Sequence, residues 1–142
     1  MFGERPSGSR CVSRETPLQA DRYLREQYEA DIDGKLSRSI FTSETVGDYL
    51  LWDLRLNPPV KITCYTHVHL LPTDHWQRCL IVKEGRPGWQ DELDRWRVQF
   101  LVIEPAINPV LARHIRESPE HWVVVPNMGP LLAARRKEAM PP

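Results

Sequence analysis

Val98-Gln99-Phe100-Leu101-Val102-Ile103 is the stretch of this 142-residue chain that decides its fold. The run is almost continuously apolar and is broken only by Gln99. A strand with one exposed face alternates apolar and polar residues, whereas a strand covered on both faces does not need polar positions. We therefore expect residues 98–103 to form the central strand of a sheet.

Strand and helix signals alternate outward from this run in both directions. The expected order is a strand at 39–42, a helix at 43–54, a strand at 60–66, helices opening near 72 and 89, the central strand, a helix opening at 108, and a strand at 122–125. After the turn at Asn127–Pro130, Leu131–Ala134 is expected to return as an antiparallel edge strand. This order predicts a three-layer, Rossmann-like α/β domain. Its sheet would be short and mostly parallel, with four or five strands and helices on both faces.

One glycine inside a predicted helix carries packing information. Gly47 lies in the middle of the 43–54 helix, where glycine costs about 1 kcal/mol relative to alanine. We therefore expect this helix to pack closely against a neighbouring element at Gly47.

The length of the chain corresponds to about one domain. Residues 1–15 are rich in Ser, Arg and Gly and are predicted to be disordered. A helix opens at Thr16-Pro17, so we predict one α/β domain over residues 16–135, followed by a loose charged tail at 136–142.

The charge balance argues against two classes of partner. The 19 basic and 19 acidic residues cancel, so neither nucleic acid nor an anionic membrane surface is favoured. No apolar stretch approaches the ~20 residues that a membrane-spanning helix needs, so no direct membrane insertion is expected. Residues 1–15 also lack the apolar core of a secretory signal. Taken as a complete chain, the sequence predicts a cytoplasmic protein.

Familiar catalytic and cofactor motifs are missing from the sequence. Cys11, Cys64 and Cys79 are odd in number and fit no metal or redox spacing, and the last two are expected to be small buried hydrophobes. Neither a glycine-rich phosphate loop nor a nucleophile elbow is present. We therefore expect no cofactor and assign no catalytic residue.

One dense polar cluster follows the predicted strand at 60–66. Ligands of open α/β sheets bind just past the carboxyl ends of strands, so this cluster is the candidate ligand-binding site. Its members are Tyr65, Thr66, His67, His69, Asp74 and His75. His67 and His69 alternate along the chain and are expected at the rim of the crevice, with at least one accessible to solvent.

The same cluster supports a second interpretation. Two or three imidazoles and a carboxylate can bind zinc, which would make the chain a small metal-dependent hydrolase using His67, His69, Asp74 and His75. The spacing matches no standard zinc signature, so ordinary capping and hydrogen bonding in a loop remain an alternative, and metal binding is undetermined.

The five tryptophans give a third interpretation. Most occupy helical positions suited to packing, but Trp89 follows a turn and is expected to be partly exposed, which adds it to the candidate binding residues. A protein-interaction domain would show an exposed apolar patch where Trp52 or Trp89 emerges.

Several segments together resemble a known family over about residues 17–135. The segments are Ile40–Ser43 with Val46–Trp52, Val60–Leu70, Gly85–Trp89 with Leu93–Trp96, Val98–Ile103, and Trp122–Val125. They resemble the soluble C-terminal domain of large bacterial multi-pass membrane proteins related to polyprenyl-phosphate-sugar-dependent glycosyltransferases. Many relatives have an Asp-Gly-Arg-like stretch where this chain has Tyr65-Thr66-His67.

The resemblance implies a non-catalytic accessory domain. In that group the domain follows the last membrane helix and faces outside the cytoplasm, and the catalytic carboxylate belongs to the membrane part. If this chain is a fragment of such a protein, it is expected on the extracytoplasmic face of the cell membrane. Its strand-end loops would contact a membrane-embedded glycosyltransferase-like region, a glycan or a lipid-linked sugar.

Overall fold

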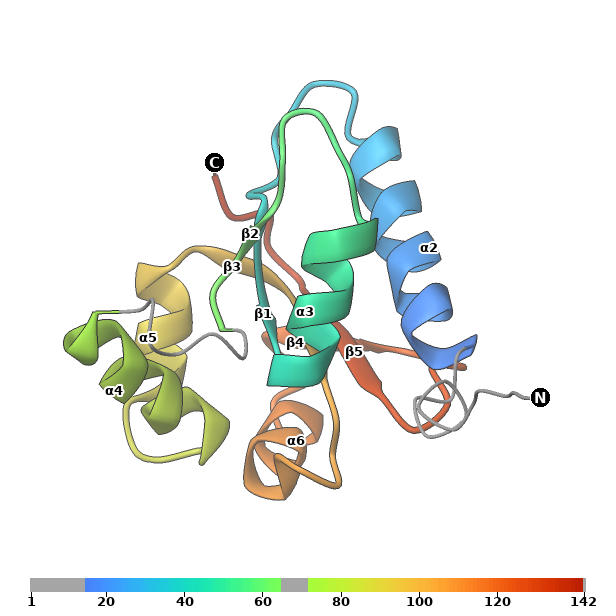
Figure 1. Cartoon of the computed structure of the whole chain (residues 1–142). Coiled ribbons are helices and arrows are strands. Elements are labelled where there is room, and N and C mark those ends of the chain that lie inside the picture. The colour runs from blue at the N-terminus through green and yellow to red at the C-terminus, as the bar shows by residue number, and fades with distance from the viewer. Residues whose placement is uncertain (1–14, 65–71, 142) are drawn as a thin grey trace.

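The structure, a computed structural model, describes residues 15–64 and 72–141 as helices packed around a five-stranded sheet (Figure 1). In chain order the elements are α2 (Glu15–Ala30), β1 (Ser39–Thr42), α3 (Glu44–Asp53), β2 (Lys61–Ile62), α4 (Thr73–Lys83), α5 (Trp89–Arg95), β3 (Val98–Ile103), α6 (Pro109–Arg116), β4 (Trp122–Val125) and β5 (Leu132–Arg136).

The sheet has the strand order β2-β1-β3-β5-β4. β1 pairs with β2 and with β3 in parallel, whereas β5 pairs with β3 and with β4 in antiparallel fashion. β3 is the middle strand, and all six of its residues are buried. The prediction that residues 98–103 form the central strand is therefore confirmed.

The predicted sheet differs from the observed one in its C-terminal half. β5 is antiparallel, as expected, but it lies between β3 and β4, so the edge strands are β2 and β4. The sheet is therefore mixed. The prediction of a mostly parallel, Rossmann-like sheet with its antiparallel strand at the edge is wrong. The burial of Leu132, Ala133 and Ala134 gives the physical reason, because a strand covered on both faces suits an interior position.

β2 is also shorter than predicted. Only Lys61 and Ile62 form a strand, where residues 60–66 were expected. Past Ile62, threonine hydroxyls supply part of the bonding to β1. Thr63 donates to the Ile40 carbonyl through both its N–H (3.0 Å) and Oγ1 (3.2 Å), and Thr42 Oγ1 donates to the Cys64 carbonyl at 3.1 Å.

Helices cover both faces of the sheet, as predicted. Successive strand residues point to opposite faces. On one face, Phe100 and Val102 pack with the buried residues of α2 and α3; on the other, Leu101 and Ile103 pack with those of α4, α5 and α6. In Figure 1, α2 accordingly lies on the right of the molecule, and α4 and α5 lie on its left.

Gly47 marks the close contact of α3 with β1 and β2. A Cβ atom at this position would lie 2.5 Å from Thr42 Oγ1 and 2.6 Å from the Cys64 carbonyl oxygen. No side chain fits in that space without a shift of the backbone, so the close packing expected from the sequence is confirmed.

Gln99 interrupts the register of β3 and holds the end of the chain. Ser39 is paired with Val98 and Ile40 with Phe100, so Gln99 is an extra residue relative to β1. Its buried side chain donates to the Arg136 carbonyl at 3.2 Å and accepts from the Met140 N–H at 2.6 Å. Arg136 and Met140, which follow the predicted domain boundary at 135, are thus bonded to the central strand.

Candidate functional site

The structure describes part of the predicted polar cluster. Tyr65, Thr66, His67 and His69 lie outside the described residues. Asp74 is exposed in the first turn of α4. His75 is half-buried, and its Nε2 lies 2.7 Å from the Thr63 carbonyl oxygen. Because a carbonyl only accepts, this nitrogen carries the proton, and His75 ties α4 to the end of β2.

Trp89 has a packing contact of its own. Its half-buried ring stacks on the His114 ring at a centroid distance of 5.4 Å and an angle of 3°. His114 Nε2 in turn lies 3.1 Å from the Gly85 carbonyl oxygen. Trp89 therefore joins α5 to α6 through His114.

Metal-binding groups were sought among residues 15–64 and 72–141. Within these ranges no three His, Cys, Asp or Glu side chains lie close enough together to hold a metal ion. His67 and His69, which the zinc interpretation requires, lie outside them.

At the carboxyl ends of the neighbouring parallel strands β1 and β3, the two following segments turn to opposite faces of the sheet. β1 leads to α3 on one face of the sheet, and β3 leads to α6 on the other. Such divergence between neighbouring parallel strands is the usual place for a ligand crevice in α/β sheets. This point lies beside β2, the strand that precedes the predicted ligand-binding cluster, and a ligand role there stays a prediction.

Two buried helix-capping residues close this position from within. Ser43 and Asn108 precede α3 and α6, and neither makes a side-chain bond to its own helix. Instead Ser43 Oγ donates to Asn108 Oδ1 at 2.6 Å and accepts the Glu104 N–H at 2.7 Å. The sequence signal for these residues is that of helix starts, and it does not reveal that the two caps bond each other across 65 positions.

Charged side chains at the rim of the same edge are bonded to neighbouring side chains. Thr45 Oγ1 donates to Glu104 Oε1 at 2.6 Å, and Lys83 Nζ lies 2.8 Å from Glu44 Oε1. The Lys83 ammonium also lies 4.7 Å from the centre of the Trp76 ring. These polar groups are engaged in contacts that hold α3, α4 and the β3–α6 connection together.

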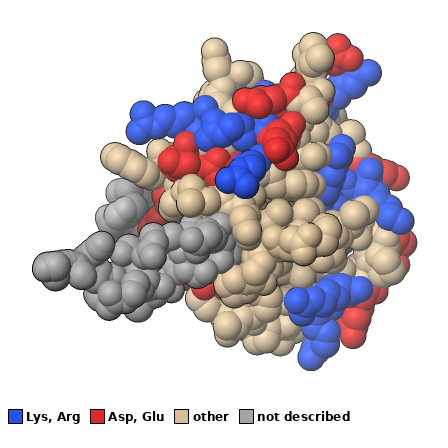
Figure 2. Space-filling model, turned by 90° about the vertical axis from the view of Figure 1, so that its right-hand side faces the viewer, with Lys and Arg blue, Asp and Glu red and all other residues tan. Residues whose placement is uncertain are grey.

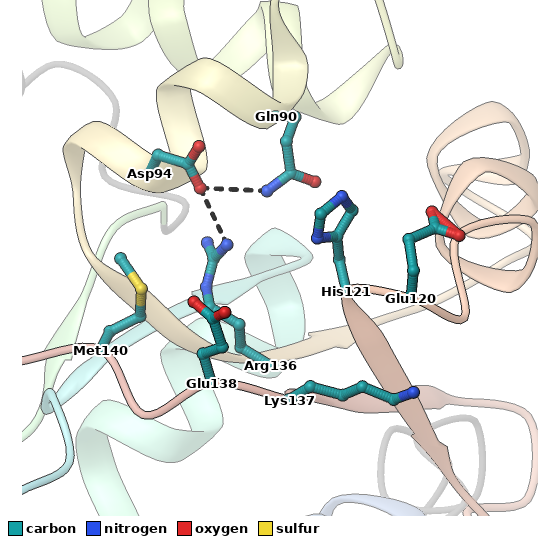
Figure 3. A pocket seen from close by; sticks show the side chains of 8 residues that line it. All are labelled: Gln90, Asp94, Glu120, His121, Arg136, Lys137, Glu138 and Met140. Carbon is teal, nitrogen blue, oxygen red and sulfur yellow. Dashed lines mark hydrogen bonds and ion pairs between the residues drawn. The ribbon is translucent and has the colours of Figure 1, made fainter.

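A pocket of about 400 Å³ lies at the opposite end of the sheet, between α5, the start of β4 and the end of β5 (Figure 3). Two cationic and three acidic side chains contribute to its walls. The lining residues are Gln90, Asp94, Glu120, His121, Arg136, Lys137, Glu138 and Met140. The sequence did not predict this site, because Arg136 and its neighbours belong to the segment 136–142 that was expected to be a loose charged tail.

Arg136 is the buried centre of the pocket wall. Its Nη1 lies 2.8 Å from Asp94 Oδ1, and its Nε donates to the Val98 carbonyl at 2.9 Å. The guanidinium also stands 4.6 Å from the centre of the Trp122 ring. Burial lowers the pKa of Arg136 from its ordinary value, whereas the nearby Asp94 acts in the opposite direction.

A hydrogen-bonded chain fixes the guanidinium in place. Trp122 Nε1 donates to Gln90 Oε1 at 3.2 Å, and Gln90 Nε2 donates to Asp94 Oδ1 at 3.1 Å. Arg136 Nη2 is buried and has no hydrogen-bond partner among the described residues. The exposed Glu120, His121, Lys137 and Glu138 surround this rigid base, so the pocket offers both donors and acceptors to a polar ligand.

Surface charge gives no preference for one sign of ligand. On the face shown in Figure 2, basic and acidic side chains are interspersed rather than separated by sign. This agrees with a formal net charge of zero for the whole chain.

No known protein family and no curated protein matches this sequence. Among solved structures, the fold is similar to that of the C-terminal globular domain of an oligosaccharyltransferase from Archaeoglobus fulgidus. The TM-score is 0.52 at 9% sequence identity, and the match covers 84% of this chain and 95% of that chain. The two share a fold. The comparison supports the resemblance seen in the sequence at the level of fold alone.

None of the helices in residues 15–64 and 72–141 combines the length and the apolar character needed to cross a bilayer.

Proposed function

We propose that this chain is a non-catalytic accessory domain of a bacterial membrane protein related to polyprenyl-phosphate-sugar-dependent glycosyltransferases, acting on the extracytoplasmic face of the cell membrane. The observation that carries the proposal is the fold similarity to a C-terminal oligosaccharyltransferase domain, which extends over 95% of that domain. The sequence resemblance over about residues 17–135 indicates the same class of protein and does not depend on that structure.

An accessory domain acts by contact, and the end of α3 presents an apolar contact surface. Trp52 is 73% exposed and Leu51 is 47% exposed, whereas the preceding Leu50 is fully buried. Arg55 covers part of the Trp52 ring, with its guanidinium carbon 5.6 Å from the ring centre. Exposed tryptophans beside arginine are frequent at the centres of protein interfaces. We place the contact with the membrane-embedded region at Leu51 and Trp52.

A glycan or the sugar of a lipid-linked donor is the second partner that we propose, and the pocket around Arg136 supports it. A hydroxyl group both donates and accepts hydrogen bonds, so it can satisfy the mixed lining of Arg136, Glu138 and His121. A simple anion would instead meet three acidic side chains in the same wall. The loop with His67 and His69, which the sequence favours for this contact, stays a prediction.

The test begins with the DNA that surrounds the coding sequence. The proposal requires a reading frame with many transmembrane helices upstream of this domain. That membrane protein, made separately in detergent, should retain the tagged chain on a column. Trp52→Ala should reduce retention at least tenfold, because the variant removes the exposed ring.

Ile32→Ala is the matched control, since Ile32 is an apolar side chain that is 90% exposed elsewhere. Retention of the control should equal that of the unmodified chain. If no such frame is present, or if the unmodified chain is not retained, the accessory-domain proposal fails. Equal retention of the Trp52 and Ile32 variants would show that the contact does not lie at the end of α3.

A further inference from the structure

Cys64 and Cys79 meet in the core between β2 and α4. Cys64 follows Thr63 directly past the end of β2, and Cys79 lies in the middle of α4. Both side chains are fully buried in the same hydrophobic cluster. Cys79 Sγ donates to the Thr63 carbonyl at 3.4 Å, which places this sulfur against the backbone next to Cys64. Each thiol also shifts the pKa of the other, that of Cys64 downwards and that of Cys79 upwards.

We propose that Cys64 and Cys79 are joined by a disulfide bond when the domain folds in an oxidising environment, which links β2 covalently to α4. The position of the Cys79 sulfur, 3.4 Å from the carbonyl that precedes Cys64 and in the same buried cluster, supports this inference by itself. Bond formation in the cell, by contrast, rests on the proposed extracytoplasmic location, because disulfides persist mainly outside the cytoplasm.

The oxidant is the disulfide of a small molecule or of another protein, and oxidised glutathione is the simplest example. One cysteine thiolate attacks a glutathione sulfur, forms a mixed disulfide and releases a first glutathione thiolate. The second cysteine thiolate then attacks the mixed disulfide at the protein sulfur and releases the second glutathione as a thiolate. The two cysteines lose two protons and two electrons, and the oxidised glutathione is reduced to two thiols.

The surroundings favour Cys64 as the attacking group. The neighbouring Cys79 thiol lowers the pKa of Cys64, burial acts in the opposite direction, and the nearby Lys83 ammonium lowers it further. Because both sulfurs are buried in the folded domain, the reaction belongs to folding or to local opening of the segment between them.

The test uses the full chain with Cys11→Ser, which leaves two cysteines. The reduced, unfolded protein is refolded in a mixture of reduced and oxidised glutathione, and its mass and tryptic peptides are measured. Trypsin cuts after Lys61, Arg78 and Lys83, so Cys64 and Cys79 fall in separate peptides. We expect most molecules to lose two hydrogen atoms and to yield these two peptides as one linked species.

The thermal unfolding midpoint gives a second readout. A bond that closes a loop of this size should raise the midpoint by about 10 °C, and a reducing agent should reverse the rise. Cys79→Ala, in the same background, should show no difference between the two conditions. Refolded protein in which both cysteines remain free, or a linked form with a lower midpoint than the reduced form, would overturn the inference.

Protein isolated from its native host separates this inference from the proposed function. A disulfide that forms readily in vitro but is absent from native protein would support the thiol contact and contradict an extracytoplasmic location.

Discussion

Asp21 is expected to make the stability of this domain fall as the pH rises through 6. It lies on α2 and is almost completely buried, and its Oδ1 accepts a 3.0 Å bond from Arg25 Nη2. Oδ2 is buried and has no hydrogen-bond partner among the described residues. The Asp53 carboxylate at the end of α3 is close enough to raise the pKa of Asp21.

Burial is the largest cause, and Asp53 the next, of a rise in the pKa of Asp21 from its ordinary value of 3.8 to about 6. The folded state therefore binds the Asp21 proton more tightly than the unfolded state, so the contribution is fully present at low pH and is lost as the pH rises from about 4 to above 6. A shift of roughly two pKa units corresponds to about 3 kcal/mol. Because the Asp53 side chain is only half-buried and solvent screens its effect on Asp21, we expect about 2 kcal/mol.

The assay is urea unfolding of the unmodified chain and of Asp21→Asn at pH 4.5, 5.5, 6.5 and 7.5, followed by tryptophan fluorescence. The asparagine does not ionise at any of these pH values, so the variant should gain about 2 kcal/mol relative to the unmodified chain between pH 4.5 and 7.5. Asp33→Asn is the control, because the Asp33 side chain is 74% exposed and should leave the pH profile unchanged. Parallel profiles for the unmodified chain and Asp21→Asn would refute the reasoning.

Three further substitutions test other parts of the structure. Gly47→Ala should lower the free energy of unfolding by about 1–3 kcal/mol despite better helix propensity, because its Cβ would meet the Cys64 carbonyl at 2.6 Å; a stabilised variant in chemical denaturation would contradict this packing. Ser43→Ala should cost about 1–3 kcal/mol in the same measurement, since it leaves Asn108 Oδ1 and the Glu104 N–H without their bonds, and a change below about 0.5 kcal/mol would show that the two caps are not coupled. Trp52→Gln should change stability by less than about 0.5 kcal/mol, because the ring is 73% exposed, and a larger loss would mean that Trp52 serves the fold rather than a partner.

The candidate site was only partly predictable from the sequence. The rule that ligands bind at the carboxyl ends of parallel strands led to the cluster after the strand at 60–66, and that ligand role stays a prediction. It does not reveal that Ser43 and Asn108 bond each other at the carboxyl ends of β1 and β3, because the two residues are 65 positions apart and each alone is an ordinary helix start. The ligand role of Tyr65, Thr66, His67 and His69 stays a prediction.

The sequence by itself determined the elements whose evidence is local. A run such as residues 98–103 must be covered on both faces, whatever surrounds it, because almost all of its side chains are apolar. The same holds for the helix that contains Gly47, where a missing side chain inside a helix indicates close packing. Both features follow from a few adjacent residues, and both agree with the structure.

Only the tertiary structure decided which distant segments meet. β5 lies between β3 and β4 because the chain turns back after β4 and pairs on both sides, and no local pattern distinguishes that position from an edge. The raised pKa of Asp21, the buried guanidinium of Arg136 and the contact of Cys79 with the Thr63 carbonyl have the same origin. Each depends on desolvation or on a partner from another element, and these arise only when the chain is folded.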